Sequence, residues 1–288
     1  MRASVLTTAE EAVAGVRPGA TIGIGGVINS GHPMAIVREI VRQGIGDLHV
    51  VGLASGLEVD MLITAGLVRR LSTPTVSAET LQPIAPAYRR AAEAGEIEIW
   101  ECDEGMVYAA LQAAAQRVPF APWPAGMGAS FAQINDGMEE IAAPFGGRRV
   151  LALRAIELDV AFAHAARADV YGNVQVDGSG FGDRALAQAA RRVVYTVDRI
   201  IPNHEVRRRP ETTVIAGVDA VVHAPFGAHP FAAPGLHIHD EDHLRRYLSD
   251  PAGYVAEWVA GPASHWDYVR RVGAEALHGL EEGLHAGS

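Results

Sequence analysis

The sequence predicts an α/β fold, because short apolar runs alternate with amphipathic helical patterns along most of the chain. The 288 residues are 49% apolar and 20% charged, which is enough to bury one large core. We see no internal repeat, low-complexity tract or linker. We therefore expect one domain over residues 1–288.

The first strand, turn and helix are the clearest of these units. A short apolar strand is predicted over Ala20 to Gly25 and a helix over Met34 to Gln43. Pro33 stands at the expected start of the helix, and Gly44 stands at its expected end. The residues between strand and helix are rich in glycine, so this unit also holds the first candidate site.

The same pattern continues to the end of the chain. Further strands are predicted over 47–53, 96–100, 150–155, 158–164, 193–197 and 218–224. Helices are predicted over 58–71, 106–118 and 183–191, and the last sixty residues are also predicted to be helical. Prolines and glycines are concentrated in residues 119–147, which we expect to be an active-site loop region.

Charge and composition exclude several functions. The formal net charge is −10, and the longest basic run is Arg207 to Arg209, so we expect no nucleic-acid partner. The chain contains no lysine, which excludes Schiff-base chemistry, covalently held pyridoxal phosphate and a P-loop lysine.

Cysteine count and apolar patterning point to a cytoplasmic protein. Cys102 is the one cysteine, so the chain has no internal disulfide, and we expect this residue to be a small buried apolar group. No apolar run is long enough to span a membrane, and the first residues lack the apolar core of a signal peptide. We expect no membrane partner.

The glycine-rich stretch over 21–33 is the first candidate site. It does not fit the dinucleotide fingerprint, because the third glycine would fall on Ile28 and no acidic residue ends the next predicted strand. A strand that enters a glycine turn before a helix N-terminus favours an anion or a developing oxyanion instead. A turn needed only for chain geometry is the alternative. The predicted binding residues are Gly25, Gly26 and Gly31.

Two later stretches repeat this construction. One is 52–56, which contains Ser55, and the other is 125–130, which contains Gly126, Gly128 and Ser130. If all three turns follow strands of one open α/β sheet, they converge where such sheets bind ligands. We therefore predict that these residues line one substrate pocket.

Glu104 is the candidate catalytic residue. It lies where a predicted strand becomes a helix, close to Asp103, which we expect to cap that helix. A partly desolvated carboxylate at this point would serve as a base or a nucleophile. Between 179 and 183, Ser-Gly-Phe-Gly-Asp is predicted to cap a helix rather than to contact substrate.

Four histidines near the C-terminus are a weaker candidate for a metal site. His237, His239 and His243 follow His229, but their spacing does not place three ligands on one face of a regular element. We expect no bound metal.

Taken together, these segments resemble the α (A) subunit of class I coenzyme A transferases, especially the glutaconate-type branch. The resemblance extends over nearly the whole chain, and it depends on the order and spacing of its parts rather than on one motif. The segments that carry it are 21–26 with 32–34, 56–66, 113–120, 158–165 with 172–173, and 218–222 with 224–230.

The resemblance implies an open, mostly parallel sheet flanked by helices and a homologous β (B) subunit in an αβ or α2β2 assembly. It implies an acyl-CoA substrate, so coenzyme A arrives as part of the substrate and no cofactor is bound permanently. A glutamate of the β subunit would form the glutamyl-CoA thioester. This chain would supply the oxyanion turn of Gly25, Gly26 and Gly31, with Ser55 and Gly128 lining the pocket.

A second branch of the same family is also similar to this chain. Residues 103–106, 111–117 and 125–128 resemble the hydrolases that cleave a carbon–carbon bond in steroid ring opening. The resemblance implies that Glu104 does the chemistry in such an enzyme. The hydrolases carry an arginine where this chain has Pro124, and proline offers neither charge nor donor. We favour the transferase, with the hydrolase and a non-catalytic acyl-CoA binding chain as alternatives.

Overall fold

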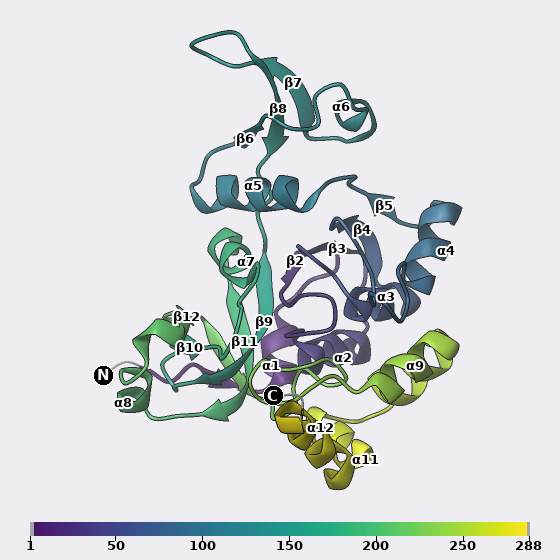
Figure 1. Cartoon of the computed structure of the whole chain (residues 1–288), viewed down its shortest axis with the longest axis vertical. Helices are drawn as coiled ribbons and strands as arrows, with labels where there is room; N and C mark the ends of the chain where they lie inside the picture. The colour runs from purple at the N-terminus through teal and green to yellow at the C-terminus, as the bar shows by residue number, and fades with distance from the viewer. Residues whose placement is uncertain (1–2, 287–288) are drawn as a thin grey trace.

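The computed structural model describes residues 3–286, and its centre is one large sheet (Figure 1). The strands of this sheet are β1 (Leu6–Thr7), β2 (Thr21–Ile24), β3 (Leu48–Val51), β4 (Val68–Ser72), β5 (Glu98–Ile99), β9 (Val160–Ala168), β10 (Val174–Gln175), β11 (Val193–Ile200), β12 (Thr213–Ile215) and β13 (Ala220–His223). The main path is β1-β13-β11-β9-β2-β3-β4-β5, and all its neighbouring pairs are parallel. β10 pairs antiparallel with both β9 and β12. The predicted α/β fold with an open, mostly parallel sheet is confirmed.

Helices cover both faces of this sheet. On one face the core includes residues of α1 (Ala9–Ala14), α2 (Met34–Gln43), α3 (Leu57–Thr64), α4 (Pro86–Ala94), α9 (Glu241–Ser249), α10 (Pro251–Tyr254) and the π-helical turn Val255–Ala260. On the other face lie α5 (Glu104–Ala115) and α7 (Asp183–Ala189). The remaining helices are α8 (Asn203–Val206), the 3-10 turn Pro210–Thr212, α11 (His265–Val272) and α12 (Ala274–Ala286). The helical C-terminal region is thus confirmed.

The alternation of side chains along β2 explains how the two layers pack. Ile22 and Ile24 are buried in the core on the side of α1 to α4. Gly23 faces the opposite way, where an added Cβ would overlap the side chains of Leu158 and Leu186. Glycine at this position therefore lets α7 lie close against the middle of the sheet.

A small antiparallel sheet projects from the α5 side of the molecule (Figure 1). It has the order β6-β8-β7, from β6 (Phe120–Trp123), β7 (Met138–Ala142) and β8 (Arg149–Arg154), and carries the short helix α6 (Phe131–Ile134). The sequence predicted a loop region over 119–147, which is wrong because β6 and β7 within it pair with β8. The strand predicted over 150–155 is confirmed as β8, in this second sheet.

The first helical unit follows its sequence signals closely. α2 spans Met34–Gln43 as predicted, and Gly44 ends it in a left-handed conformation with φ of 63°. The helix predicted over 58–71 is wrong in its second half, because α3 ends at Thr64 and the chain turns at Gly66, where φ is 71°. The residues that follow form β4, a strand that was not predicted from the sequence. The helix α4 was not predicted either.

The order of the strands creates a switch point at the centre of the sheet. From β2 the chain adds β3, β4 and β5 on one side, and later it adds β9, β11 and β13 on the other side. β2 and β9 are therefore neighbours from which the connections diverge, and the carboxyl end of β2 lies beside Phe162 in β9. In open α/β sheets, ligands bind at this point.

Candidate active site at the sheet switch point

A hollow lies beyond the carboxyl end of β2, against the middle of β9. Its walls include the glycine turn after β2, residues 164–166 of β9, and the loop before α7. The residues used below are Gly26, Gly31, His164, Phe181 and Asp183, all of which line it. Two of the predicted binding residues, Gly26 and Gly31, therefore lie at the site that the topology also indicates.

The glycine turn is held by a buried carboxylate. The backbone N–H of Gly26 donates to Oδ1 of Asp183 at 3.0 Å, and Gly26 has a φ of 101°. A Cβ at Gly25 would overlap the same carboxylate and Ala163. Glycine is thus required at both positions, because the turn must pass directly over Asp183.

Most backbone donors of this turn already have partners. The N–H of Gly25 donates to the carbonyl oxygen of Phe162 and that of Gly31 to the carbonyl oxygen of Ala232, each at 2.8 Å. The N–H of Gly26 is the one that meets a side chain. An incoming oxyanion would therefore compete with Asp183 for this donor, and the oxyanion role of the turn stays a prediction.

The turn after β3 meets the turn after β2, as predicted. Ile28 N–H donates to the carbonyl oxygen of Ala54 at 2.9 Å. His32 lies between the two turns, with its ring nitrogens 2.9 and 3.0 Å from the carbonyl oxygens of Gly25 and Ile28. Glu58 lies 3.4 Å from His32, and burial lowers the pKa of His32 to about 4 and raises that of Glu58 to about 8. Burial therefore favours the neutral forms of both side chains.

Ser55 lies in the second turn, behind the hollow. Its side chain is buried, and its hydroxyl shares a hydrogen bond of 3.1 Å with the hydroxyl of Thr73. Ser55 is not among the residues that line the hollow. A substrate-binding role for it stays a prediction.

The third glycine turn belongs to the second sheet. Gly126, Gly128 and Ser130 follow β6, so the expectation that all three turns follow strands of one parallel sheet is wrong. A Cβ at Gly126 would overlap Met106 of α5, so this loop lies against α5. Substrate binding by these three residues stays a prediction.

Glu104 is the first residue of α5 and is exposed to solvent. Asp103 caps the helix as predicted, because its carboxylate accepts from the N–H of Met106 at 2.7 Å. Tyr108 follows Glu104 by one helical turn and lines a second hollow together with Phe181. Since Phe181 also lines the switch-point hollow, Tyr108 of α5 borders the same depression, whereas Glu104 is not among the residues that line either hollow.

The segment 179–183 was predicted to cap a helix, and it does lead into α7, but none of its side chains caps that helix. Gly182 is the N-cap of α7 without a side-chain cap, while the Asp183 carboxylate binds Gly26. Burial raises the pKa of Asp183 to about 7, opposed by the Gly26 N–H and by His164. The one sequence feature that could have indicated this role is an acidic residue directly after Gly-Phe-Gly at the start of a predicted helix.

A buried polar group behind the hollow was also missed. His164 lies between the hydroxyl of Thr196, at 2.8 Å, and the carboxylate of Asp198, at 2.7 Å. The other oxygen of Asp198 accepts from the N–H of Phe226 at 2.6 Å. These contacts fix the ring of His164 at the wall of the hollow. The residues of this group come from β9, β11 and the segment after β13, so no short sequence motif contains them all.

Two of the four C-terminal histidines, His229 and His243, form contacts with tyrosine hydroxyls. His229 lies 2.7 Å from the hydroxyl of Tyr268 and 3.1 Å from Asp240, and His243 lies 3.0 Å from the hydroxyl of Tyr254. Within residues 3–286, no group of three or more His, Cys, Asp or Glu side chains is arranged to hold a metal ion.

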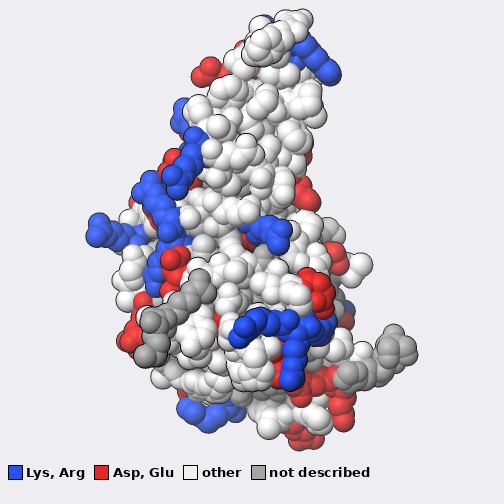
Figure 2. Space-filling view, turned by 90° about the vertical axis from the view of Figure 1, so that its left-hand side faces the viewer, with Lys and Arg blue, Asp and Glu red and all other residues white. Residues whose placement is uncertain are grey.

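The surface carries mixed charge. Figure 2 shows arginines interspersed with acidic side chains on one face of the molecule, while the projecting sheet is mostly uncharged there. None of the helices in the described part of the chain is both long and apolar enough to pass through a membrane.

Known proteins share both the sequence and the fold of this chain. Residues 6–224 match the family described as coenzyme A transferase. The chain belongs to this family. The A subunit of glutaconate CoA-transferase from Acidaminococcus fermentans is 32% identical over 303 residues, covering 96% of this chain and 95% of that protein. The crystal structure of glutaconate coenzyme A-transferase from the same organism matches with a TM-score of 0.91 and covers 96% of both chains. The resemblance stated from the sequence is confirmed.

Two other relatives are similar over most of this chain. The IpdA chain of the cholesterol ring-cleaving hydrolase of Mycobacterium tuberculosis is 37% identical over 252 residues, covering 84% of this chain and 86% of that protein. An uncharacterized protein of Archaeoglobus fulgidus is 34% identical over 289 residues. The match spans 96% of the chain but 64% of the length of that archaeal protein.

Proposed function

We propose that this chain is the A subunit of a two-chain enzyme that transfers coenzyme A between carboxylic acids. Its partner would be a homologous B subunit, in an αβ or α2β2 assembly, and its substrate an acyl-CoA thioester. The observation that carries the proposal is the match to the glutaconate CoA-transferase over 96% of both chains with a TM-score of 0.91. The hydrolase chains are slightly more identical to this chain, at 37% and 35%, but their matches cover less of it, 84% and 91%.

The geometry supports an active site that is shared between two chains. The hollow on this chain is bordered by exposed aromatic side chains, since Tyr108 is 47% and Phe181 is 42% exposed. Glu104 is also exposed, so nothing in this chain desolvates it as a nucleophile needs. A partner chain seated here would close the hollow and supply the reacting carboxylate.

The proposed reaction proceeds by acyl exchange on that partner. A glutamate carboxylate on the B chain attacks the thioester carbonyl and expels CoA thiolate, which leaves an acyl-glutamyl anhydride. The thiolate attacks the glutamyl carbonyl and releases the first carboxylate, which leaves glutamyl-CoA. A second carboxylate then repeats these steps in reverse and departs as its own CoA thioester, so no oxidant or metal is needed.

Within this scheme the present chain would form the walls of the pocket. Of the predicted glycines Gly25, Gly26 and Gly31, Gly26 would be the donor to developing negative charge, because the N–H groups of the other two already donate to backbone carbonyls. The remaining predicted pocket residues are Ser55, Gly126, Gly128 and Ser130. Coenzyme A would enter as part of the substrate.

A second candidate function is a CoA-thioester hydrolase of the ring-opening kind. It is favoured by one observation: Glu104 lies one helical turn before Tyr108, which lines the depression together with Phe181. In that enzyme Glu104 would be the base or nucleophile, once a partner desolvated it. Pro124 argues against it, because the hydrolase pattern has an arginine there.

A transfer assay separates the two functions. The chain is co-expressed with its homologous B subunit, and the complex receives an acyl-CoA panel with and without a second carboxylic acid. We expect a new CoA thioester that forms only when the second acid is present. Turnover that does not depend on the second acid would contradict the transferase, and binding without any turnover would indicate a non-catalytic chain.

Replacement of Glu104 by glutamine sharpens this test. In a transferase with its nucleophile on the partner, Glu104→Gln should reduce kcat less than about tenfold. In the hydrolase it should lower kcat by roughly 100-fold or more, the usual range for losing an acid–base group. Glu101→Gln is the matched control, since Glu101 is also exposed and lies just before α5.

A further inference from the structure

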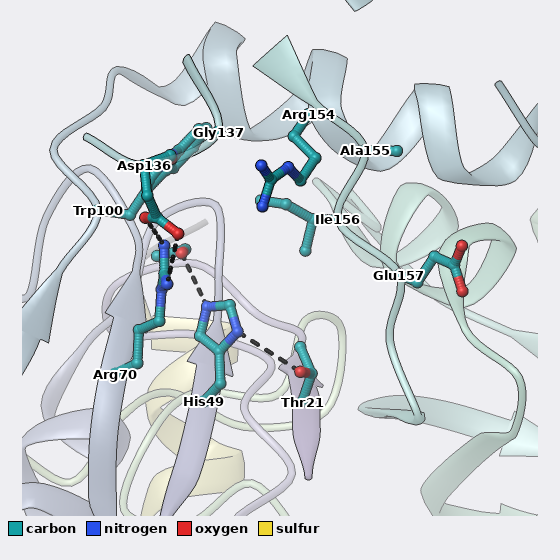
Figure 3. A pocket seen from close by; sticks show the side chains of 11 residues that line it. Thr21, His49, Arg70, Trp100, Asp136, Gly137, Arg154, Ala155, Ile156 and Glu157 are labelled. Atoms are coloured by element: carbon teal, nitrogen blue, oxygen red, sulfur yellow. Dashed lines mark hydrogen bonds and ion pairs between the residues drawn. The ribbon is translucent and has the colours of Figure 1, made fainter. Parts of the chain in front are cut away.

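A separate cavity of about 210 Å³ lies between the two sheets (Figure 3). The main sheet contributes polar side chains from β2, β3 and β4. The second sheet contributes the two residues just before β7, the last residue of β8 and the residues that follow it. This cavity shares no lining residue with the switch-point hollow. The residues used below are Thr21, His49, Arg70, Ser72, Asp136 and Arg154.

One wall of the cavity is a fixed ion pair. Arg70 of β4 binds both carboxylate oxygens of Asp136, at 3.1 and 2.5 Å. Trp100 steadies the same residue, since its indole N–H donates to the backbone oxygen of Asp136 at 3.1 Å. The charge of Arg70 is therefore balanced within the chain.

Arg154 is the arginine of the cavity lining that has no acidic partner within the described residues. Its guanidinium points into the space between the Arg70–Asp136 pair and His49 (Figure 3). Within residues 3–286 this guanidinium has no hydrogen bond or ion pair, although its charge helps to lower the pKa of Asp136. Glu157, the other acid in the lining, is bound to Arg191 at 3.0 Å. The side chain of Arg154 is exposed to solvent, so an incoming anion can reach its guanidinium.

The floor of the cavity offers neutral hydrogen-bonding groups. His49 lies 2.9 Å from the hydroxyl of Ser72 and 3.5 Å from that of Thr21. Burial, together with the positive charges of Arg70 and Arg69, lowers the pKa of His49 to about 4. The ring is thus neutral at physiological pH, and its surroundings are electropositive.

We propose that this cavity binds a small oxyanion, a carboxylate or phosphate group held by Arg154 and the hydroxyls of Thr21 and Ser72. The planar guanidinium matches two oxygens of such a group, and the neutral His49 adds no repulsion or second charge. The volume is below the roughly 300 Å³ at which sites for drug-sized ligands begin, so the ligand is small. The anion would join the second sheet to the main sheet, beside the existing Arg70–Asp136 contact.

Calorimetric titration of the full chain with two probes tests this site. Inorganic phosphate and malonate are titrated separately at constant ionic strength. The probe with the lower Kd shows whether the site prefers a phosphate or a carboxylate group. We expect saturable binding of at least one probe. The site is overturned if neither probe gives a saturable isotherm.

Matched arginine variants assign the binding to the cavity. Arg154→Ala should raise the Kd by about tenfold or more, as expected for loss of a charge-assisted hydrogen bond. Arg148→Ala is the control, because it removes an exposed arginine next to the same small sheet and outside the cavity, and should change the Kd less than about twofold. Arg154→Lys keeps the positive charge but loses the paired guanidinium donors, so its Kd should lie between those of Arg154→Ala and Arg148→Ala. If Arg154→Ala does not fold, Arg154→Lys is compared with Arg148→Ala instead. Equal effects of Arg154→Ala and Arg148→Ala would overturn the proposal.

Discussion

At the scale of single residues, the switch-point site depends on a carboxyl group that the sequence did not single out. Asp183 accepts from the N–H of Gly26 while it is itself buried. Near neutral pH its proton is easily gained or lost, since burial places its pKa at about 7. The group that holds the glycine turn therefore changes charge within the working range of an enzyme.

This pKa predicts how Asp183→Asn changes stability with pH. Because the folded-state pKa lies above the ordinary value of 3.8, the stability that Asp183 contributes is fully present below about pH 4 and is lost as the pH rises through 7. Asparagine cannot ionise, so the variant avoids this loss. Its free energy of unfolding relative to the natural chain should rise from about pH 4 to about pH 8, by up to roughly 4 kcal/mol.

Urea unfolding at about pH 4, 6 and 8 measures this difference. The same replacement at Asp242, which is exposed, should give a difference that changes little over the range. A constant difference between Asp183→Asn and the natural chain would show that the buried carboxyl is not linked to folding in this way.

Sequence reasoning found the glycines of this site but not its polar side chains. Gly25, Gly26 and Gly31 stand together in one stretch between a strand and a helix, so a local pattern is enough to reveal them. Asp183 and His164 reach the same place from distant parts of the chain. Only the register of β2 with β9 brings them together, and register cannot be read from either segment alone.

At the scale of elements, α2 is joined to the C-terminal helices through one buried arginine. The guanidinium of Arg38 lies 3.6 Å from the ring centroid of Tyr268 in α11. It also donates to the backbone oxygen of His229 at 2.9 Å. Arg38 is 1% exposed, so its charge depends on these contacts.

Arg38→Lys should therefore be costly although it keeps the charge. Lysine loses both the stacking on Tyr268 and the forked donors, and we expect the free energy of unfolding to fall by roughly 2–4 kcal/mol. Arg270→Lys is the control, because the side chain of Arg270 is 71% exposed and the change should stay within about 0.5 kcal/mol. Denaturant unfolding of both variants checks this, and similar stabilities would contradict the role given to Arg38.

Element boundaries were predicted well where a clear stop signal was present. Gly44 ends α2 in a left-handed conformation, and the predicted end was correct. Gly66 is also left-handed, but the apolar residues Leu67, Val68 and Leu71 beyond it continue a helical spacing. The predicted helix therefore ran into β4, a strand that is stabilised by pairing with β3 rather than by its own pattern.

At the scale of the whole molecule, the depression beside α5 is an open surface until a partner covers it. Phe181 borders both hollows and is 42% exposed. Exposed aromatic side chains around a hollow are typical of residues that anchor a protein interface. The proposed partner chain explains this exposure.

Phe181→Asp should therefore weaken assembly with the B subunit. Burial of a carboxylate without a partner opposes association, so we expect the Kd of the complex to rise by at least about tenfold. Trp266→Asp is the control, because Trp266 is similarly exposed, at 48%, but lies on α11. Analytical ultracentrifugation of each variant with the B subunit measures the Kd of the complex. An equal rise in Kd for the two variants would contradict an interface at Phe181.

The whole-molecule prediction from the sequence was right in class and incomplete in topology. Alternating strands and helices indicated the parallel sheet, which the structure confirms. The second sheet was missed because β6 contains Pro122 and β7 carries consecutive acidic residues, patterns that are unusual for strands. Its strands form only because β8, which is more apolar, pairs with both.

The most direct test of the proposed function is the intact mass of both chains, measured once the complex has reacted with an acyl-CoA and been denatured. The proposed transferase predicts that the B subunit gains the mass of covalently attached coenzyme A, and that this chain keeps its own mass. If turnover proceeds without any adduct on the B subunit and stops in Glu104→Gln, the transferase proposal is wrong and the chemistry belongs to this chain.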